Sequence, residues 1–201
     1  MTELLLVAGC AGITVFCLWV AVSARKRRPL MLGRAARAVG VAMSLRGGLV
    51  GPSNDEFGQI ADRIGARLGW SEAQRVRLAN TIQVRQIGFA AIPYQHLRQP
   101  HLHRVRERAP EIGADLLERL PIWSQFSDEL RPTRRSEVGQ LIALLEEFFY
   151  RMESAPAMDV LRQIQSQTDD RYDLAMREAA VGVLQESYGN RVARPKVALV
   201  D

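Results

Sequence analysis

The chain has 201 residues, of which 47% are hydrophobic and 24% are charged, and this is the composition of a globular protein with a packed core. Its formal net charge of +5 is concentrated between Arg25 and Pro52, a segment with seven basic residues and no acid. From Ser53 onward, acidic and basic residues nearly balance. No helical segment carries a basic stripe with interleaved aromatic residues, so the sequence argues against a nucleic-acid-binding function. The only cysteines, Cys10 and Cys17, lie near the N-terminus, which excludes a disulfide framework for the rest of the chain.

Residues 4–24 form an uncharged run that is long enough, as a helix, to cross a hydrocarbon core of about 30 Å. Trp19 lies near the far end of this run, and a basic cluster follows it directly: Arg25, Lys26, Arg27 and Arg28. Because positive charge stays on the cytoplasmic side, the pattern predicts a single-pass anchor in the cytoplasmic membrane, with the N-terminus outside and the domain inside. A cleaved signal peptide fits less well, because its basic residues would precede the apolar run.

Residues 29–52 are predicted to be a juxtamembrane linker. The part from Leu30 to Leu45 mixes apolar residues with Arg34 and Arg37, and two interpretations stay open. It is either an amphipathic helix on the membrane surface, with its arginines toward anionic lipid, or a connecting helix that packs on its own domain.

The pattern from Ser53 onward is helical. Two sequences are typical of capping boxes, Ser53 to Glu56 and Ser71 to Gln74, and apolar residues recur after each at helical spacing. Further helices are expected at 104–108, from Pro110, from Ser136, from Pro156 and from Thr168. The predicted fold class is all-α, and the predicted divisions are 1–28 (anchor with its basic flank), 29–52 (linker), 53–188 (helical domain) and 189–201 (tail).

A family resemblance rests on the stretch from Val84 to Leu97. The residues Ile87-Gly88, Ile92-Pro93 and Leu97 resemble the centre of the HD-GYP family, a branch of the HD phosphohydrolases. In that family a helix ends in Leu-His-Asp-Ile-Gly-Lys and continues into an Ile-Pro turn. The segments 68–72, 109–114 and 172–183 resemble further parts of the family, so the resemblance implies an HD-like helical bundle over roughly 53–184. The His-His-Glu and Gly-Tyr-Pro segments of the family have no counterpart between Leu120 and Ser136, and a related non-catalytic output domain of the HD group fits the same frame.

The resemblance also locates the former metal ligands. It places Arg85 where the family has a metal-binding His, Gln86 where it has an Asp, and Ala109 and Ser53 where it has further histidines. None of these four side chains supplies an imidazole or a carboxylate, so the resemblance implies a non-catalytic module without a metal or other cofactor. Arg85 is expected to make a structural ion pair or to reach solvent. The alternative is that its guanidinium replaces the cation of the former metal cavity and pairs with a carboxylate such as Glu111 or Asp115, or binds a phosphate.

The chain has three histidines, and they fall within eight residues of one another: His96, His101 and His103. The pair His101 and His103 is a weak metal-binding signal, and a solvated loop explains it better. The expected function is therefore a membrane-anchored regulatory or scaffolding module that binds a protein partner, with nucleotide binding and homo-oligomer formation left open. The alternative is an atypical metal-dependent phosphohydrolase or cyclic-dinucleotide phosphodiesterase that uses these histidines.

Overall fold

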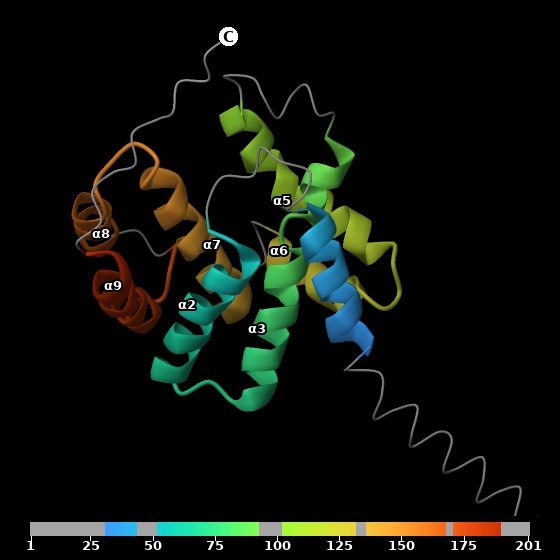
Figure 1. Ribbon diagram of the computed structural model, residues 1–201, viewed down its shortest axis with the longest axis horizontal. Coiled ribbons are helices and arrows are strands. Elements are labelled where there is room, and N and C mark those ends of the chain that lie inside the picture. Colours follow the sequence, from blue (N-terminus) through green and yellow to red (C-terminus); the bar gives the residue numbers. More distant parts are fainter. Residues whose placement is uncertain (1–30, 44–51, 93–101, 132–135, 168–170, 190–201) are drawn as a thin grey trace, which may run out of the picture.

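The computed structural model describes residues 31–43, 52–92, 102–131, 136–167 and 171–189, and all regular elements within these ranges are helices (Figure 1). The predicted all-α class is therefore confirmed. Besides a helix at 31–43, the elements are α2 (Asn54–Arg67), α3 (Glu72–Val84), the 3-10 helix η1 (Ile87–Ala91), α5 (Leu102–Glu118), the 3-10 helix η2 (Ser124–Phe126), α6 (Ser127–Leu130), α7 (Glu137–Arg151), α8 (Ala157–Ser166) and α9 (Leu174–Tyr188). The predicted anchor at 4–24 lies outside the described residues, and none of the helices described is long and apolar enough to cross a membrane.

Side-chain caps begin several of these helices. The Oγ of Ser53 accepts a hydrogen bond from the Glu56 amide at 3.2 Å, and Ser71 forms a reciprocal capping box with Gln74. Ser136 caps α7 as the sequence predicts. The last helix begins later than expected, because its cap is Asp173, whose carboxylate accepts from the Met176 amide at 3.1 Å. The predicted start at residues 168–170 lies outside the described part of the chain.

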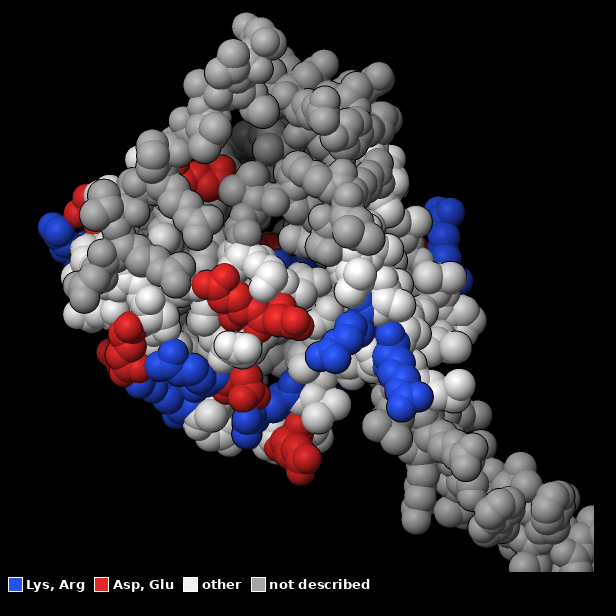
Figure 2. Space-filling model, viewed as in Figure 1, with Lys and Arg blue, Asp and Glu red and all other residues white. Residues whose placement is uncertain are grey.

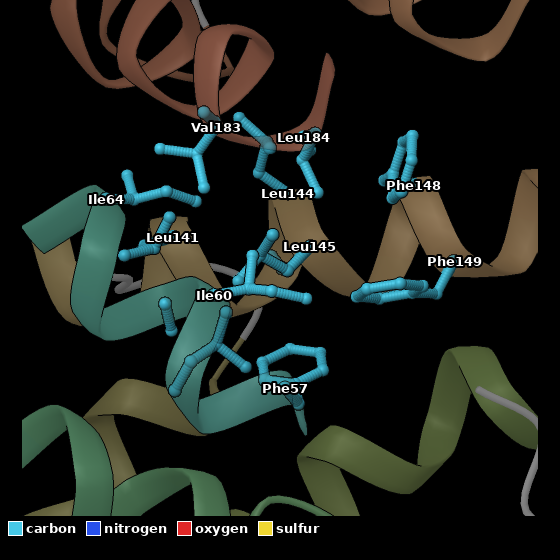
Figure 3. Close-up of a cluster of buried hydrophobic side chains, with 14 of the residues drawn as sticks. Phe57, Ile60, Ile64, Leu141, Leu144, Leu145, Phe148, Phe149, Val183 and Leu184 are labelled. Carbon is cyan, nitrogen blue, oxygen red and sulfur yellow. The ribbon is translucent and has the colours of Figure 1, made fainter. Parts of the chain in front are cut away.

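The larger hydrophobic core is built around α7. Figure 3 shows α2 on one side of α7 and α9 on the other, with their apolar side chains directed toward it. Four of the aromatic rings in this core meet in tilted and edge-on pairs with centroids 5.2–5.8 Å apart, and they belong to Phe57, Phe148, Phe149 and Tyr188. Burial of such side chains contributes roughly 1.5–3 kcal/mol each, so α7 is the principal stabilising element.

A smaller core lies on the other side of α3. It consists of buried residues from helix 31–43, α3, α5, η2 and α6: Ala36, Val84, Ala114, Leu117, Phe126 and Leu130. Gly40 allows the close approach of helix 31–43, because a Cβ there would lie 2.5 Å from the Gln83 Oε1 and 2.7 Å from the Asn54 Nδ2. The structure thus packs the inner face of this helix on the domain, while Arg34 and Arg37 remain exposed.

Helix α5 corrects the expectation of two separate helices on either side of Pro110. It is one continuous helix from Leu102 to Glu118 with Pro110 inside it, whereas the sequence predicted a break at the proline. A proline usually disrupts a helix because it removes one hydrogen bond. Here residues on both sides of Pro110 are buried on one face, Ala109 before it and Leu117 after it, and this packing offsets the loss. The buried leucine is Leu117, while Leu116 is only partly buried.

Candidate functional site

The positions that the resemblance assigns to metal ligands converge in space. Arg85 ends α3, and Gln86 begins η1 directly after it. Gly88 of η1 lies so close to α5 that a Cβ there would collide with the carbonyl of Ala109. Ser53 begins α2, and the next residue, Asn54, accepts a hydrogen bond from the Arg85 guanidinium. Four elements, α2, α3, η1 and α5, therefore bring all four positions to one region of the molecule.

The guanidinium of Arg85 is the centre of this region. Its Nη1 donates to the Asn54 side-chain oxygen and, at 3.1 Å, to the carbonyl of Ile82. Its Nε lies 3.6 Å from the Oε1 of Glu146 on α7, and its Cζ lies 4.1 Å from the centroid of the Phe57 ring. A carboxylate and an aromatic face are two groups that stabilise a guanidinium removed from water.

Burial dominates the electrostatics of Arg85. Only 3% of its side chain is exposed, and its Nε has no hydrogen-bond partner among the described residues. Burial lowers the pKa of this guanidinium to about 10, and the nearby Glu146 carboxylate partly offsets that effect. Arg85 is therefore still protonated at neutral pH. A phosphate ligand would have to compete with Glu146 for a charge that is almost completely covered.

The carboxylate beside Arg85 is not one that the sequence suggested. Glu111 and Asp115 lie on α5 and are both directed to Arg131, with Nη–O distances of 3.8 Å and 2.9 Å. Glu118 joins the same group at 2.6 Å from Arg131. Sequence spacing could not identify Glu146, because it belongs to a helix more than fifty residues further along the chain.

The predicted histidine site cannot be placed. His96 and His101 lie outside the described residues, and for His103 the structure describes only the backbone, within α5. No group of three or more His, Cys, Asp or Glu side chains in the described ranges could hold a metal ion. Gln86 is half-buried and Ala109 is buried, and neither side chain carries an imidazole or a carboxylate.

A second polar cluster, which the sequence analysis missed, surrounds Glu129 of α6. Only 1% of its side chain is exposed, and its Oε1 lies 2.5 Å from the Nε of Arg77 on α3. The hydroxyl of Ser136 donates to its other oxygen. Burial raises the pKa of Glu129, although Arg77 acts in the opposite direction. The cluster joins α3 and α6 to the beginning of α7. Arg77 and Glu129 form a structural ion pair, and Ser136 adds a hydrogen bond to it.

Comparisons of the chain with protein-family models, with curated proteins and with solved structures find no match. The function must therefore be argued from the geometry of these residues.

Proposed function

We propose that the protein is a membrane-anchored, non-catalytic helical module with an HD-like arrangement, which acts as a regulatory or scaffolding domain by binding a protein partner at the cytoplasmic face of the membrane. Two features support this proposal. The buried Arg85 guanidinium occupies the region that the resemblance assigns to metal ligands, and residues 4–24 form an apolar run.

The observation that carries the proposal is the position of the Arg85 guanidinium. A hydrolytic site of the HD type needs imidazole and carboxylate groups that face a metal ion. Here the corresponding region holds a buried permanent cation, which already has Asn54, Glu146 and the Phe57 ring as neighbours. A metal ion that approached Glu146 would meet this positive charge at short range, and the low-dielectric surroundings would strengthen the repulsion. Arg85 thus takes the electrostatic place of a cation and supplies no ligand.

The anchor is the second part of the proposal. The uncharged run at 4–24 and the basic residues 25–28 support a single crossing with the domain in the cytoplasm. Helix 31–43 follows the basic residues closely and is packed on the domain through Ala36 and Met43. A helix that packs on the domain and follows the basic residues this soon in the sequence suits a module that holds a partner at the membrane.

Metal content and hydrolysis test the non-catalytic part. The full-length chain, purified in detergent, is expected to contain no stoichiometric iron, manganese or zinc and to leave cyclic dinucleotides intact. The control carries His101→Ala and His103→Ala together. One equivalent of metal in the unaltered chain, lost in this variant along with phosphodiesterase activity, would overturn the proposal. Tight binding of a cyclic dinucleotide without turnover would keep the non-catalytic assignment and replace the protein partner by a nucleotide.

Protease protection tests the topology. In intact spheroplasts, added protease is expected to leave residues 53–201 uncut. Cleavage of this region from outside would contradict the cytoplasmic location.

A further inference from the structure

One face of helix 31–43 points away from the domain. Ala36 and Met43 are buried on the inner side, whereas Arg34 and Arg37 are exposed and Met31 has 68% of its surface exposed. The segment 31–43 contains no acidic residue. The outer face of this helix is therefore basic, with an exposed apolar side chain at the end nearer the anchor. Figure 2 shows basic side chains on the lower right of the molecule, where Figure 1 places this helix.

The turn after α5 adds apolar side chains beside this helix. Leu120 and Ile122 are 44% and 66% exposed, and the preceding Arg119 is also exposed. Trp123, at the end of the turn, packs on the same small core as Leu32 of helix 31–43. The shared core holds the turn and the helix next to each other, and Figure 1 shows the turn after α5 beside that helix.

We propose that these two elements form a surface that rests on a bilayer containing anionic lipid. The surface, called here the membrane face, consists of Met31, Arg34, Arg37, Arg119, Leu120 and Ile122. In the docked state the apolar side chains enter the boundary between headgroups and acyl chains, and the arginines contact lipid phosphates.

The proposal rests on the anchor of the proposed function. Between Ala24, the last residue of the uncharged run, and Met31 the chain can span at most about 25 Å. The membrane face therefore begins within a short distance of the bilayer, and a tether of this length keeps its effective concentration at the lipid surface high. A docked domain gains contacts there without a further loss of translational freedom.

Charge complementarity distinguishes this face from the surface near α2 and α9. There the exposed arginines hold carboxylates: Arg63 lies 2.6 Å from Glu186, and Arg75 lies 2.7 Å from Asp62. Arg67 also contacts Glu186, so the three arginines and two carboxylates there carry a net charge of +1, whereas the membrane face holds three arginines and no acid. The membrane face combines basic and apolar residues, which is the composition of segments that bind the membrane interface.

Single-cysteine labelling tests the proposal on the full-length chain. In a chain with Cys10→Ala and Cys17→Ala, Ile122→Cys is labelled with an environment-sensitive fluorophore. The protein is then reconstituted in vesicles of phosphatidylcholine and phosphatidylglycerol. The label at position 122 is expected to shift its emission to the blue and to be quenched by spin-labelled lipid. The matched control is Arg162→Cys on α8, where 74% of the native side chain is exposed and which lies far from helix 31–43 in Figure 1. Its label is expected to remain aqueous.

Charge reversal and a second label complete the test. Arg34→Glu with Arg37→Glu should lower the ratio of docked to undocked label by more than about fivefold per position, because each change removes the attraction of one basic residue, which is about fivefold, and adds a carboxylate that the anionic surface repels. A label at 122 that stays as aqueous as the one at 162 overturns the membrane face and leaves this surface to a protein partner. A chain that retains only Cys17 reports on the anchor separately. Lipid quenching at 17 without quenching at 122 keeps the proposed anchor and rejects the membrane face, whereas absence of quenching at 17 rejects the anchor itself.

Discussion

Gly88 lies against the carbonyl of Ala109, and no side chain could fit between them. A Cβ on Gly88 would also come within 2.8 Å of the Gly113 amide nitrogen, so η1 crosses α5 at a point where both neighbours are backbone atoms. This crossing fixes the position of Arg85 and Gln86 relative to α5. The glycine of the Ile87-Gly88 motif is thus required by close packing of two backbones, which holds whether or not the site has any chemistry.

Gly88→Ala should therefore destabilise the domain. The backbone of α5 cannot move aside as a flexible side chain can, and the cost should be roughly 1–3 kcal/mol or more, as for other overpacked sites. The control is Gly58→Ala in α2, where a Cβ meets nothing within 4 Å. That variant should be more stable by about 0.5–1 kcal/mol, because alanine favours the helix. Chemical denaturation of both variants measures the difference, and a neutral Gly88→Ala would contradict the close crossing.

The two leucines of α5 give a second test. Leu117→Ala should cost about 2–5 kcal/mol, since Leu117 is fully buried in the small core. Leu116→Ala should cost clearly less, because Leu116 is only partly buried. Thermal or urea unfolding of the pair measures the ratio, and equal losses would mean that the helix is rotated from the orientation described.

The sequence predicts those features of the fold that depend on neighbouring residues, and it fails where contacts between distant segments decide the structure. The caps Ser71 and Ser136 and the apolar spacing of α2 and α7 are local signals, and they predicted those helices correctly. Pro110 is also a local signal, but it misled because tertiary packing of Ala109 and Leu117 outweighs the lost hydrogen bond.

The candidate site was predictable only in part. The family resemblance pointed to Arg85 as the residue of interest, and Arg85 is the buried charge at the end of α3. Its partners Asn54, Phe57 and Glu146 come from two other helices, and no spacing rule connects them. Glu129 was missed for a similar reason. A glutamate that follows Asp128 in a short polar segment gives no indication in the sequence that it will be buried.

Replacement of Arg85 tests the role of the buried charge. Arg85→Met keeps much of the volume but removes the hydrogen bond to Asn54 and the contact with Glu146. We expect a loss of about 1–3 kcal/mol, the usual cost when buried polar groups lose a partner, reduced because Glu146 is 42% exposed. Arg85→Lys should recover only part of this loss, since an ammonium cannot form the same set of contacts. Arg162→Met on the exposed surface of α8 should change stability by less than about 0.5 kcal/mol. Loss of stability in Arg162→Met as large as in Arg85→Met would contradict the special role of burial.

The pH dependence of stability tests the Glu129 cluster. Burial raises the pKa of Glu129 in the folded state above its value in the unfolded chain, so the protonated form is favoured by folding. A group of this kind contributes stability that is fully present below the unfolded pKa, about 4.3, and is lost as the pH rises through the folded pKa. Arg77 limits this loss by its ion pair.

Arg77→Met should raise the pKa of Glu129 in the folded state further. The pH range between the unfolded and the folded pKa, over which stability is lost, should therefore become wider. At pH 8 the variant should be less stable than the parent by about 1–3 kcal/mol, a range reduced from that of fully buried pairs because the Arg77 side chain is 47% exposed. The difference should shrink as the pH falls toward 4.5, where Glu129 can accept a proton. Adding Glu129→Gln to Arg77→Met should abolish this pH dependence.

The control is Arg63→Met. Its partner Glu186 has a pKa lowered mainly by Arg67 and also by Arg63, so the effect of this variant on stability should change with pH only below 4.5. Denaturant unfolding from pH 4 to pH 8 measures these curves, and an Arg77→Met deficit that is the same across that range would refute a buried, charged Glu129.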